Sequence, residues 1–555
     1  MKSPSAQLQI DLQQAAEHHR AGRLNDAIAL YRKAVASDPR NADITQMLAL
    51  AQHQSGNDAE AIPLFNRALM LDPANVSALQ NLLELYRRQG NWDKVLECAR
   101  KLTNLRPADS EIRMLYAGAL AQAGRLDEAA PAYQKLLESQ PTNIQAQHSL
   151  AEIYRLQKKF SLAEPEFQKL VRLRPNDVQA WVGLADSLRW QYKMEPWLAA
   201  SQRAVQIDPN SVDALHQLGW ALLDLARPRE ALPLVERAIR LSPREPRLYW
   251  LRGFILLMLG EYPQGWNNYE SRWEVTGLNL KRPSLGRPQW RGEDLRGKTV
   301  YLFPEQGLGD TLQFIRYAPL ILERGAKDVF VATPPEIESL LARSMPGIKL
   351  LRPGDPLPEI DFQCPIMSLP LAFGTTLENV PAKVPYLTPD PVAVTKWKER
   401  LSQYPGLKVG LAWAGRPTNP NDFHRSTTLQ KLRGLAGIPG IQFVSLQKGY
   451  ASDQAKQVPE LGMIDWTSEL NDFADTAALV GALDHVISIC TSITHLSGAM
   501  GKPTSTILSY TADFRWMLDR DDSPWYPSIK LFRQPTYGEW DSVVQNVRKA
   551  LSDLR

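Results

Sequence analysis

Residues 22–39 read GRLNDAIALYRKAVASDP, and residues 56–73 read GNDAEAIPLFNRALMLDP. The two segments begin 34 positions apart and share a leading glycine, an internal alanine, an aromatic residue and a closing Asp-Pro. The proline keeps this interval along the first half of the chain, at Pro39, Pro73, Pro107, Pro141, Pro175, Pro209 and Pro243. A fixed interval of this length predicts an array of structural repeats.

Each repeat is expected to be a pair of helices joined by a tight turn. The proline closes a helix because it lacks the backbone donor that a further turn needs. A glycine suits the turn because it tolerates positive φ, and the register holds Gly22, Gly56, Gly90, Gly124 and Gly260. Small residues that let the paired helices approach stand at Ala27, Ala61, Ala129, Ala163 and Ala231, and aromatic residues stand at Tyr31, Phe65, Tyr133, Phe167 and Tyr269. Most of these positions are therefore structural.

This combination resembles the tetratricopeptide repeat over residues 8–275, as seven full repeats and an eighth that merges into a linker. The small-residue register departs from the pattern at Val95, Trp197 and Gly265. The resemblance implies a superhelix over residues 1–275 whose concave groove binds an extended peptide or a partner protein.

The composition narrows the class of protein. A chain of 555 residues is expected to hold two to four folding units. A net charge of +4 favours neither nucleic acid nor an anionic membrane as a partner. The N-terminus does not resemble a secretory signal, and no stretch is apolar enough for a spanning helix. The three isolated cysteines fit a reducing compartment, so we expect a cytoplasmic protein that is not an integral membrane protein.

Residues 276–298 form a linker rich in Gly, Pro and Arg, in which Trp290 is expected to pin the chain to the next domain. After it, β-rich runs alternate with helical segments, in two sets. The predicted strands are TVYLF, DVFVAT, IKLL and DFQCPIM in residues 299–390, and KVGLAWAG, QFVSLQ, HVISIC and PTSTILS in residues 391–555. Alternation of this kind predicts parallel sheets. The fold class is therefore α plus α/β, a solenoid followed by two Rossmann-like lobes, with the active site expected in their shared cleft.

The first lobe opens with YLFPEQGLGDTLQF at residues 301–314, a strand, a glycine turn and a helix. Gly307 and Gly309 would let the backbone approach a ligand, and the helix start offers free N–H donors. The segment lacks the full GxGxxG of dinucleotide-binding folds. Asp310 follows the turn, where helix capping and catalysis are both open.

The second lobe contains SICTSITHLSGAMGKP at residues 488–503. Thr491 and Ser492 follow the strand, and His495 lies near the start of the next helix. Hydroxyls, backbone amides and the helix dipole would converge there on an anion such as a diphosphate, to which His495 adds a hydrogen-bond donor.

Five motifs together carry a second resemblance: EQGLGD, AWAG, NDFHRST, SLQKG and THLSGAMGKP. Over residues 299–534 the chain is similar to the heptosyltransferase-like family, glycosyltransferase family 9, which has the GT-B fold. Repeats joined to such a domain also resemble bacterial tetratricopeptide glycosyltransferases, including those that modify flagellin. The resemblance implies an inverting glycosyltransferase that needs no metal and no cofactor, with the nucleotide-sugar as a substrate.

The same resemblance implies a role for each matching residue. Asp310 would be the general base that deprotonates the acceptor hydroxyl. Arg425 would stabilise the departing diphosphate. Thr491, Ser492 and His495 would bind that diphosphate, and Gln447 would contact the nucleotide. The glycines of the first turn, Gly307 and Gly309, complete the donor-binding set.

Relatives usually carry Asp at the position of Cys490, so this chain departs from the pattern on the donor side. Three hypotheses therefore stand. The first is sugar transfer to a hydroxyl on a protein that the repeats recruit. The second is an interaction scaffold whose catalytic domain has decayed, and the third is transfer to a saccharide or a lipid-linked glycan. The sequence does not specify the sugar, the nucleotide, the acceptor or the oligomeric state.

Overall fold

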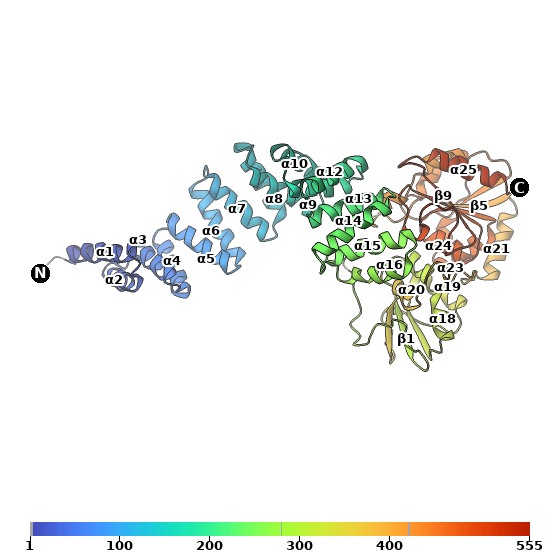
Figure 1. Ribbon diagram of the computed structural model, residues 1–555, viewed down its shortest axis with the longest axis horizontal. Helices are drawn as coiled ribbons and strands as arrows, with labels where there is room; N and C mark the ends of the chain where they lie inside the picture. Colours follow the sequence, from blue (N-terminus) through green and yellow to red (C-terminus); the bar gives the residue numbers. More distant parts are fainter. Residues whose placement is uncertain (1–3, 279, 420–421, 555) are drawn as a thin grey trace. The chain divides into compact units, whose positions relative to one another are not determined.

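The computed structural model describes residues 4–278, 280–419 and 422–554 (Figure 1). The chain divides into two compact units, residues 1–208 and 209–555. The described part of the first unit consists of helices joined by short turns. Its helices are α1 Pro4–Arg20, α2 Leu24–Ser37, α3 Ala42–Gln54, α4 Asp58–Leu71, α5 Val76–Arg88, α6 Trp92–Leu105, α7 Ser110–Gln122, α8 Leu126–Ser139, α9 Ile144–Leu156, α10 Phe160–Leu173, α11 Val178–Arg189 and α12 Met194–Ile207.

The predicted helix pairs, and the predicted residues at their turns and ends, are confirmed. Each register proline from Pro39 to Pro243 lies in the short link after the second helix of a pair. The register alanines are fully buried, and the register aromatics are at most 4% exposed. The five register glycines have φ between 69° and 86°, in the left-handed region.

Three later turns keep this geometry without glycine. Lys158, Tyr192 and Ala226 occupy the glycine register and have φ of 58°, 58° and 55°. A side chain in this region costs about 1–2 kcal/mol relative to ordinary backbone conformations. The packing of the helix pairs thus imposes the turn even where the residue disfavours it.

The last repeats belong to the second unit. Their elements are α13 Val212–Asp224, α14 Pro228–Leu241, α15 Pro246–Leu259, α16 Tyr262–Tyr269 and the 3-10 helix η1 Glu270–Trp273. Trp266 packs its ring 5.9 Å from that of Phe314 and 5.6 Å from that of Phe514. The indole of Trp525 stacks on Tyr262 and donates a hydrogen bond of 3.2 Å to its hydroxyl. An aromatic junction therefore joins the end of the repeats to the α/β region.

The linker is also anchored as predicted. Trp290 is buried, its backbone N–H donates to the Gln363 carbonyl at 2.8 Å, and its indole N–H donates to the Glu293 carbonyl at 2.9 Å. Its ring meets that of Phe373 edge-on at 5.2 Å.

The first lobe is a parallel sheet in the order β3-β2-β1-β4. Its elements are β1 Thr299–Phe303, α17 Leu308–Phe314, α18 Tyr317–Glu323, β2 Asp328–Ala332, α19 Pro335–Ser344, β3 Lys349–Leu351, β4 Phe362–Pro365, η2 Ile366–Ser368 and α20 Leu369–Ala372. Figure 1 shows α16 beside α20, at the edge of this lobe.

The second lobe is a parallel sheet in the order β6-β5-β7-β8-β9. Its elements are α21 Pro391–Leu401, β5 Leu407–Ala412, α22 Asp422–Arg425, η3 Leu429–Leu435, β6 Ile441–Ser445, η4 Ser452–Gln457, η5 Pro459–Leu461, η6 Thr467–Glu469, α23 Phe473–Ala482, β7 His485–Ile489, α24 Ser492–Ala499, β8 Thr504–Leu508, η7 Phe514–Trp516, β9 Ile529–Arg533 and α25 Asp541–Ser552. Strand β7, in the middle of the sheet, is buried on both faces, as a parallel strand covered by helices must be.

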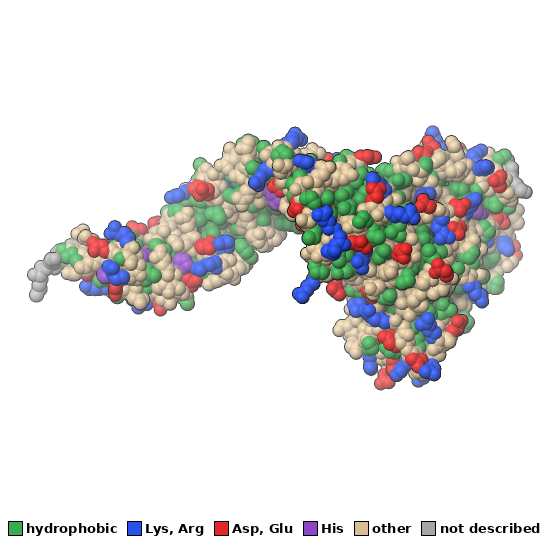
Figure 2. All heavy atoms as spheres, in the orientation of Figure 1, with side chains coloured by type: hydrophobic (Ala, Val, Ile, Leu, Met, Phe, Trp, Pro, Cys, Tyr) green, Lys and Arg blue, Asp and Glu red, His purple; other side chains and the backbone are tan. Residues whose placement is uncertain are grey.

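All eight predicted strands are present, and the chain has the predicted α plus α/β class. The prediction omitted β9. Basic and acidic side chains are interspersed on the visible face of the molecule (Figure 2). None of the described helices is both long and apolar enough to cross a membrane.

Candidate functional site

Asp310 lies in the first turn of α17, directly after the glycine turn that follows β1. One carboxylate oxygen accepts the backbone N–H of Gly307 at 2.9 Å, so the side chain does help to cap the helix. The other oxygen pairs with the guanidinium of Arg515. Asp310 is therefore held on both sides rather than left free.

Arg515 is the central cation of this site, and the sequence analysis did not identify it. Its side chain is 7% exposed, and its guanidinium donates hydrogen bonds to three side chains: both carboxylate oxygens of Asp513 at 2.8 and 2.9 Å, the amide oxygen of Gln313 at 2.6 Å, and Asp310. Burial raises the pKa of the Asp310 carboxyl above its ordinary value, although the charge of Arg515 opposes this shift. The site thus places the Asp310 carboxylate, which has a raised pKa and can accept a proton, beside the positive charge of Arg515.

The predicted anion cradle lies at the start of α24. Thr491 is buried, and its hydroxyl is 3.2 Å from that of Ser488. Its side chain does not cap the helix, so the first N–H groups of α24 have no side-chain cap from this position. Ser492 begins the helix. These N–H groups and the helix dipole favour an anion.

His495 is buried between two aromatic rings. Its Nδ1 is 3.0 Å from the Tyr526 hydroxyl, and its ring stacks on that of Trp516 at 5.8 Å. Burial and the nearby arginines hold the pKa of His495 well below its usual range, so the imidazole is neutral at pH 7. When Tyr526 donates to Nδ1, Nε2 carries the proton and is a neutral hydrogen-bond donor.

The two candidate sites meet because Gly309 has no side chain. A Cβ at this position would lie 3.0 Å from Cδ2 of His495 and 3.5 Å from the Cα of Ser492. Helix α17 of the first lobe accordingly packs directly on α24 of the second. The fold therefore brings Asp310 and the anion cradle, almost two hundred residues apart in the chain, to one place.

Arg425 also reaches this region. Its guanidinium donates to the Cys490 carbonyl at 3.1 Å, directly before the anion cradle, and to Asp422 Oδ1 at 3.1 Å. Gly415 makes room for this pair, since a Cβ there would overlap the Asp422 carboxylate and approach Nη2 of Arg425 to 2.7 Å. The AWAG and NDFHRST motifs thus form one cluster; Asn421 of the second motif lies outside the described residues.

Gln447 has a different environment from the other predicted donor-binding residues. Its amide oxygen accepts the backbone N–H groups of Trp413 and Ala414 at 2.9 and 2.8 Å. Its amide nitrogen donates to the carbonyls of Ala414 and Lys448 at 3.0 and 2.9 Å. The side chain is buried and bonded to backbone on both ends, so it holds the AWAG strand end in place.

Cys490 lies under the indole of Trp516, which donates to its sulfur at 3.0 Å. Burial raises the pKa of the Cys490 thiol to about 11. The thiol therefore stays protonated at neutral pH and is a poor nucleophile.

A second network, also absent from the sequence analysis, ties the end of the repeats to the Asp310 loop. Arg272 in η1 is fully buried and binds Glu305 through two hydrogen bonds of 2.7 and 2.8 Å. The same guanidinium binds Glu270 at 2.7 Å and the Ser368 hydroxyl at 2.9 Å. Glu305 stands five residues before Asp310, so the last repeat directly supports the loop that carries the candidate base.

The network and the candidate site are built from hydrogen bonds and ion pairs. In the described part of the chain, no three His, Cys, Asp or Glu side chains are grouped so as to hold a metal ion.

Comparisons with known proteins identify the repeats. One sequence model of the tetratricopeptide repeat matches residues 12–76, 81–144 and 216–264, and a second matches residues 120–188. The protein FlbA of Caulobacter vibrioides is 31% identical over 341 residues, which cover 56% of this chain. The chain spans 57% of the length of that relative.

Among solved structures, a MamA chain from Desulfovibrio magneticus that begins at its residue 41 is similar at 21% identity, covering 30% of this chain and 95% of that solved chain with a TM-score of 0.29. A tetratricopeptide repeat protein from Parabacteroides merdae is similar at 18% identity, covering 45% of this chain and 98% of its own, also with a TM-score of 0.29. The matches to the repeat models and the sixteen helices α1–α16 agree. The N-terminal part of the chain is a tetratricopeptide repeat array, which indicates a protein-interaction scaffold.

Proposed function

We propose that the protein is an inverting glycosyltransferase of the GT-B type, which transfers a sugar from a nucleotide diphosphate donor to a hydroxyl of a protein bound by the repeats. One observation carries the proposal. The close packing at Gly309 puts the Asp310 loop of one parallel lobe against the anion cradle of the other. Ligands of such folds bind at the carboxyl ends of the strands, where both motifs lie.

The residues of the site divide the chemistry between them. Asp310 accepts the proton of the acceptor hydroxyl while its oxygen attacks the anomeric carbon from the face opposite the leaving group. The bond to the diphosphate breaks, and negative charge grows on the leaving oxygen. In this proposal, Arg425, the first N–H groups of α24 and the Nε2–H of His495 stabilise that charge. The neutral state of His495 suits a donor that must not exchange its proton with the product.

The ion pair between Asp310 and Arg515 favours a second candidate function. A carboxylate bound to a guanidinium accepts a proton less readily than a free one. If the pair persists with donor bound, the α/β region would bind nucleotide without transfer, and the protein would act as an interaction scaffold. Cys490, in place of the family's usual Asp, points the same way.

A binding measurement followed by a transfer measurement separates the two candidates. The full chain would be titrated by calorimetry with UDP-, GDP-, dTDP- and ADP-sugars, and then incubated with each bound donor and a cell lysate. Intact-mass analysis would detect proteins that gain the mass of the sugar. We expect one donor class to bind and to support transfer. Binding without any transfer would favour the scaffold, and no donor-dependent heat would contradict nucleotide-sugar binding altogether.

Asp310→Asn tests the assigned base. The amide keeps the shape of the side chain but cannot accept the proton, so transfer should fall by about 10²–10⁴-fold while donor affinity stays within about twofold. Asp294→Asn, at an exposed linker position, is the matched control and should change neither quantity. Near-normal transfer by Asp310→Asn would show that another group is the base.

A further inference from the structure

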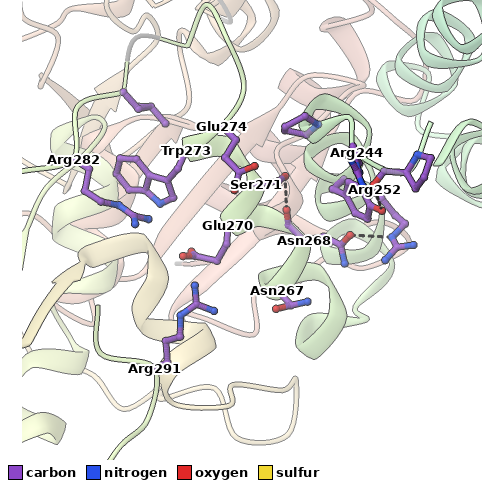
Figure 3. A pocket seen from close by; sticks show the side chains of 14 residues that line it. Arg244, Arg252, Asn267, Asn268, Glu270, Ser271, Trp273, Glu274, Arg282 and Arg291 are labelled. Atoms are coloured by element: carbon purple, nitrogen blue, oxygen red, sulfur yellow. Dashed lines mark hydrogen bonds between the residues drawn. The ribbon is translucent and has the colours of Figure 1, made fainter. Parts of the chain in front are cut away.

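A cavity of about 660 Å³ lies at the end of the repeats, in the second unit. It is lined by the α14–α15 turn, helix α15, the α16–η1 segment and the linker. Four arginines surround it: Arg244 and Arg252 on the helix side, and Arg282 and Arg291 on the linker side (Figure 3). We call it the arginine cleft. In the space-filling view, basic side chains gather over this part of the repeats (Figure 2).

None of these four guanidiniums forms an ion pair with a described residue. Arg252 donates to the amide oxygen of Asn268 at 3.0 Å, and Arg282 lies over the ring of Trp273 at 4.7 Å. Arg244 and Arg291 have neither a hydrogen bond from the guanidinium nor a ring contact among the described residues. Four cations around one cavity repel one another, and an anion placed among them would relieve that repulsion.

The carboxylates of the cleft do not neutralise these cations. Glu270 is bound by Arg272, by the Ser368 hydroxyl at 2.6 Å and by the amide of Gln289 at 2.8 Å. Glu274 is then the one lining carboxylate, among the described residues, without such partners. The arginines of the cleft therefore outnumber its available acids by four to one.

The lining also suits a polypeptide rather than a single small anion. Tyr249 and Trp273 present aromatic rings beside the arginines, and the indole N–H of Trp273 is a buried donor without a partner in the described chain. Aromatic rings with a polar edge and planar guanidiniums are the groups most enriched where proteins grip other proteins. The cavity is several times larger than an inorganic phosphate. It lies at the C-terminal end of a repeat array, and such arrays bind protein partners.

We propose that the arginine cleft binds an acidic segment of the acceptor polypeptide. The role of the cleft as an acceptor site rests on the proposed transferase function. The binding of an acidic peptide does not depend on that function. The position supports the assignment, because Glu270 and Ser271 line the cleft and the next residue, Arg272, holds Glu305 of the candidate active-site loop. A peptide seated in the cleft is thus one side chain away from the network that supports Asp310.

The test uses the full chain and a fluorescein-labelled peptide of alternating Glu and Ser, compared with the same peptide carrying Gln in place of Glu. Fluorescence anisotropy at physiological ionic strength gives the affinities. We expect the Glu peptide to bind at least about tenfold more tightly, and the double variant Arg244→Ala, Arg291→Ala to lose about tenfold, since each exposed ion pair contributes a few-fold. Arg229→Ala is the matched control, because this arginine of α14 is exposed and does not line the cleft.

Equal affinity for the Glu and Gln peptides, or unchanged binding by the double variant, would overturn the proposal. Displacement of the peptide by inorganic phosphate at a lower concentration than by unlabelled peptide would reassign the cleft to a small anion. A transfer assay on the same peptide then separates peptide binding by the cleft from sugar transfer to the bound peptide. Tight binding without transfer would contradict the transferase function but not peptide binding by the cleft. Transfer with a KM that the double variant does not change would show that the cleft does not bind the acceptor.

Discussion

Arg272→Met removes the cation that joins the last repeat to the loop before Asp310. Methionine keeps much of the volume but none of the hydrogen bonds. The parent side chain is fully buried, and its partners Glu305 and Glu270 are 1% and 11% exposed. The variant therefore leaves two carboxylates in a buried site without their positive charge.

Removing one partner of a buried ion pair costs about 3–5 kcal/mol, because the remaining charge has lost both water and its counterion. Part of this penalty can be avoided by protonation. Burial already raises the pKa of Glu305 in the parent protein, and loss of Arg272 raises it further. A carboxyl whose folded pKa exceeds its unfolded value stabilises the fold below the unfolded pKa and loses this contribution as pH rises. The deficit of Arg272→Met should therefore be larger at pH 8 than near pH 5.

Hydrogen exchange with mass spectrometry measures this penalty separately in each unit. The slowest amides of β1 and β4, next to Glu305 and Ser368, should exchange faster by about two to four powers of ten at neutral pH, the equivalent of the stated free energy. Amides of α1–α12 should be unchanged. The control is Arg296→Met, which removes an exposed pair with Asp294 and should have an effect below about 1 kcal/mol.

An equal effect in both units, or a change below about tenfold in β1 and β4, would refute the reasoning that Arg272 stabilises the second unit through buried charge pairing. A deficit that grows toward low pH would refute the assignment of Glu305 as the group left uncompensated.

Three further predictions follow from local geometry. Gly415→Ala places a Cβ where the pair of Asp422 and Arg425 lies, so thermal unfolding should show a loss of about 1–3 kcal/mol and calorimetry a weaker donor affinity; an unchanged melting temperature would contradict the packing described. Ala226→Gly relieves a left-handed backbone at φ of 55° and should raise stability by up to about 1 kcal/mol in a urea titration, whereas a loss would mean that the Ala226 methyl makes a favourable contact. Cys490, with a thiol pKa of about 11, should resist iodoacetamide at pH 7.5 in the folded protein and react only after unfolding, as peptide mapping would show.

The repeats were predictable because their signal is local. Within one repeat, the proline, glycine, alanine and aromatic positions each act on neighbouring turns. The proline recurs seven times in register, and each of the other three positions recurs five times. The left-handed turns at Lys158 and Tyr192 were not predictable from residue type, since only the register, and not the side chain, indicates them. The strands were recognisable as β-rich runs, but β9 follows an aromatic stretch that forms only the short 3-10 helix η7, so no α-helix completes the alternation.

The candidate site was predicted in part, for a different reason. Asp310, Thr491 and His495 stand at strand-to-helix turns, and parallel topology brings such turns to one edge. The partners that set their chemistry are distant in sequence: Arg515 is 205 residues from Asp310 and comes from a 3-10 helix with no motif of its own. From the sequence alone, an Arg two residues after an Asp in DFRW suggests an ordinary surface pair, and only the fold shows that it is buried.

The aromatic junction also has a consequence for how this chain can be divided. A fragment that begins at residue 299, where the first strand starts, would expose Phe314, Phe514 and Trp525, whose rings are covered by α16 in the intact protein. Such a fragment would expose an apolar patch and would leave Glu305 without its counterion Arg272, so it would be prone to aggregate. The severable boundary lies instead near residue 209, within the repeats. A fusion of this α/β region to another repeat array would therefore have to include the last two repeats. The end of the solenoid and the two lobes behave as one folding unit.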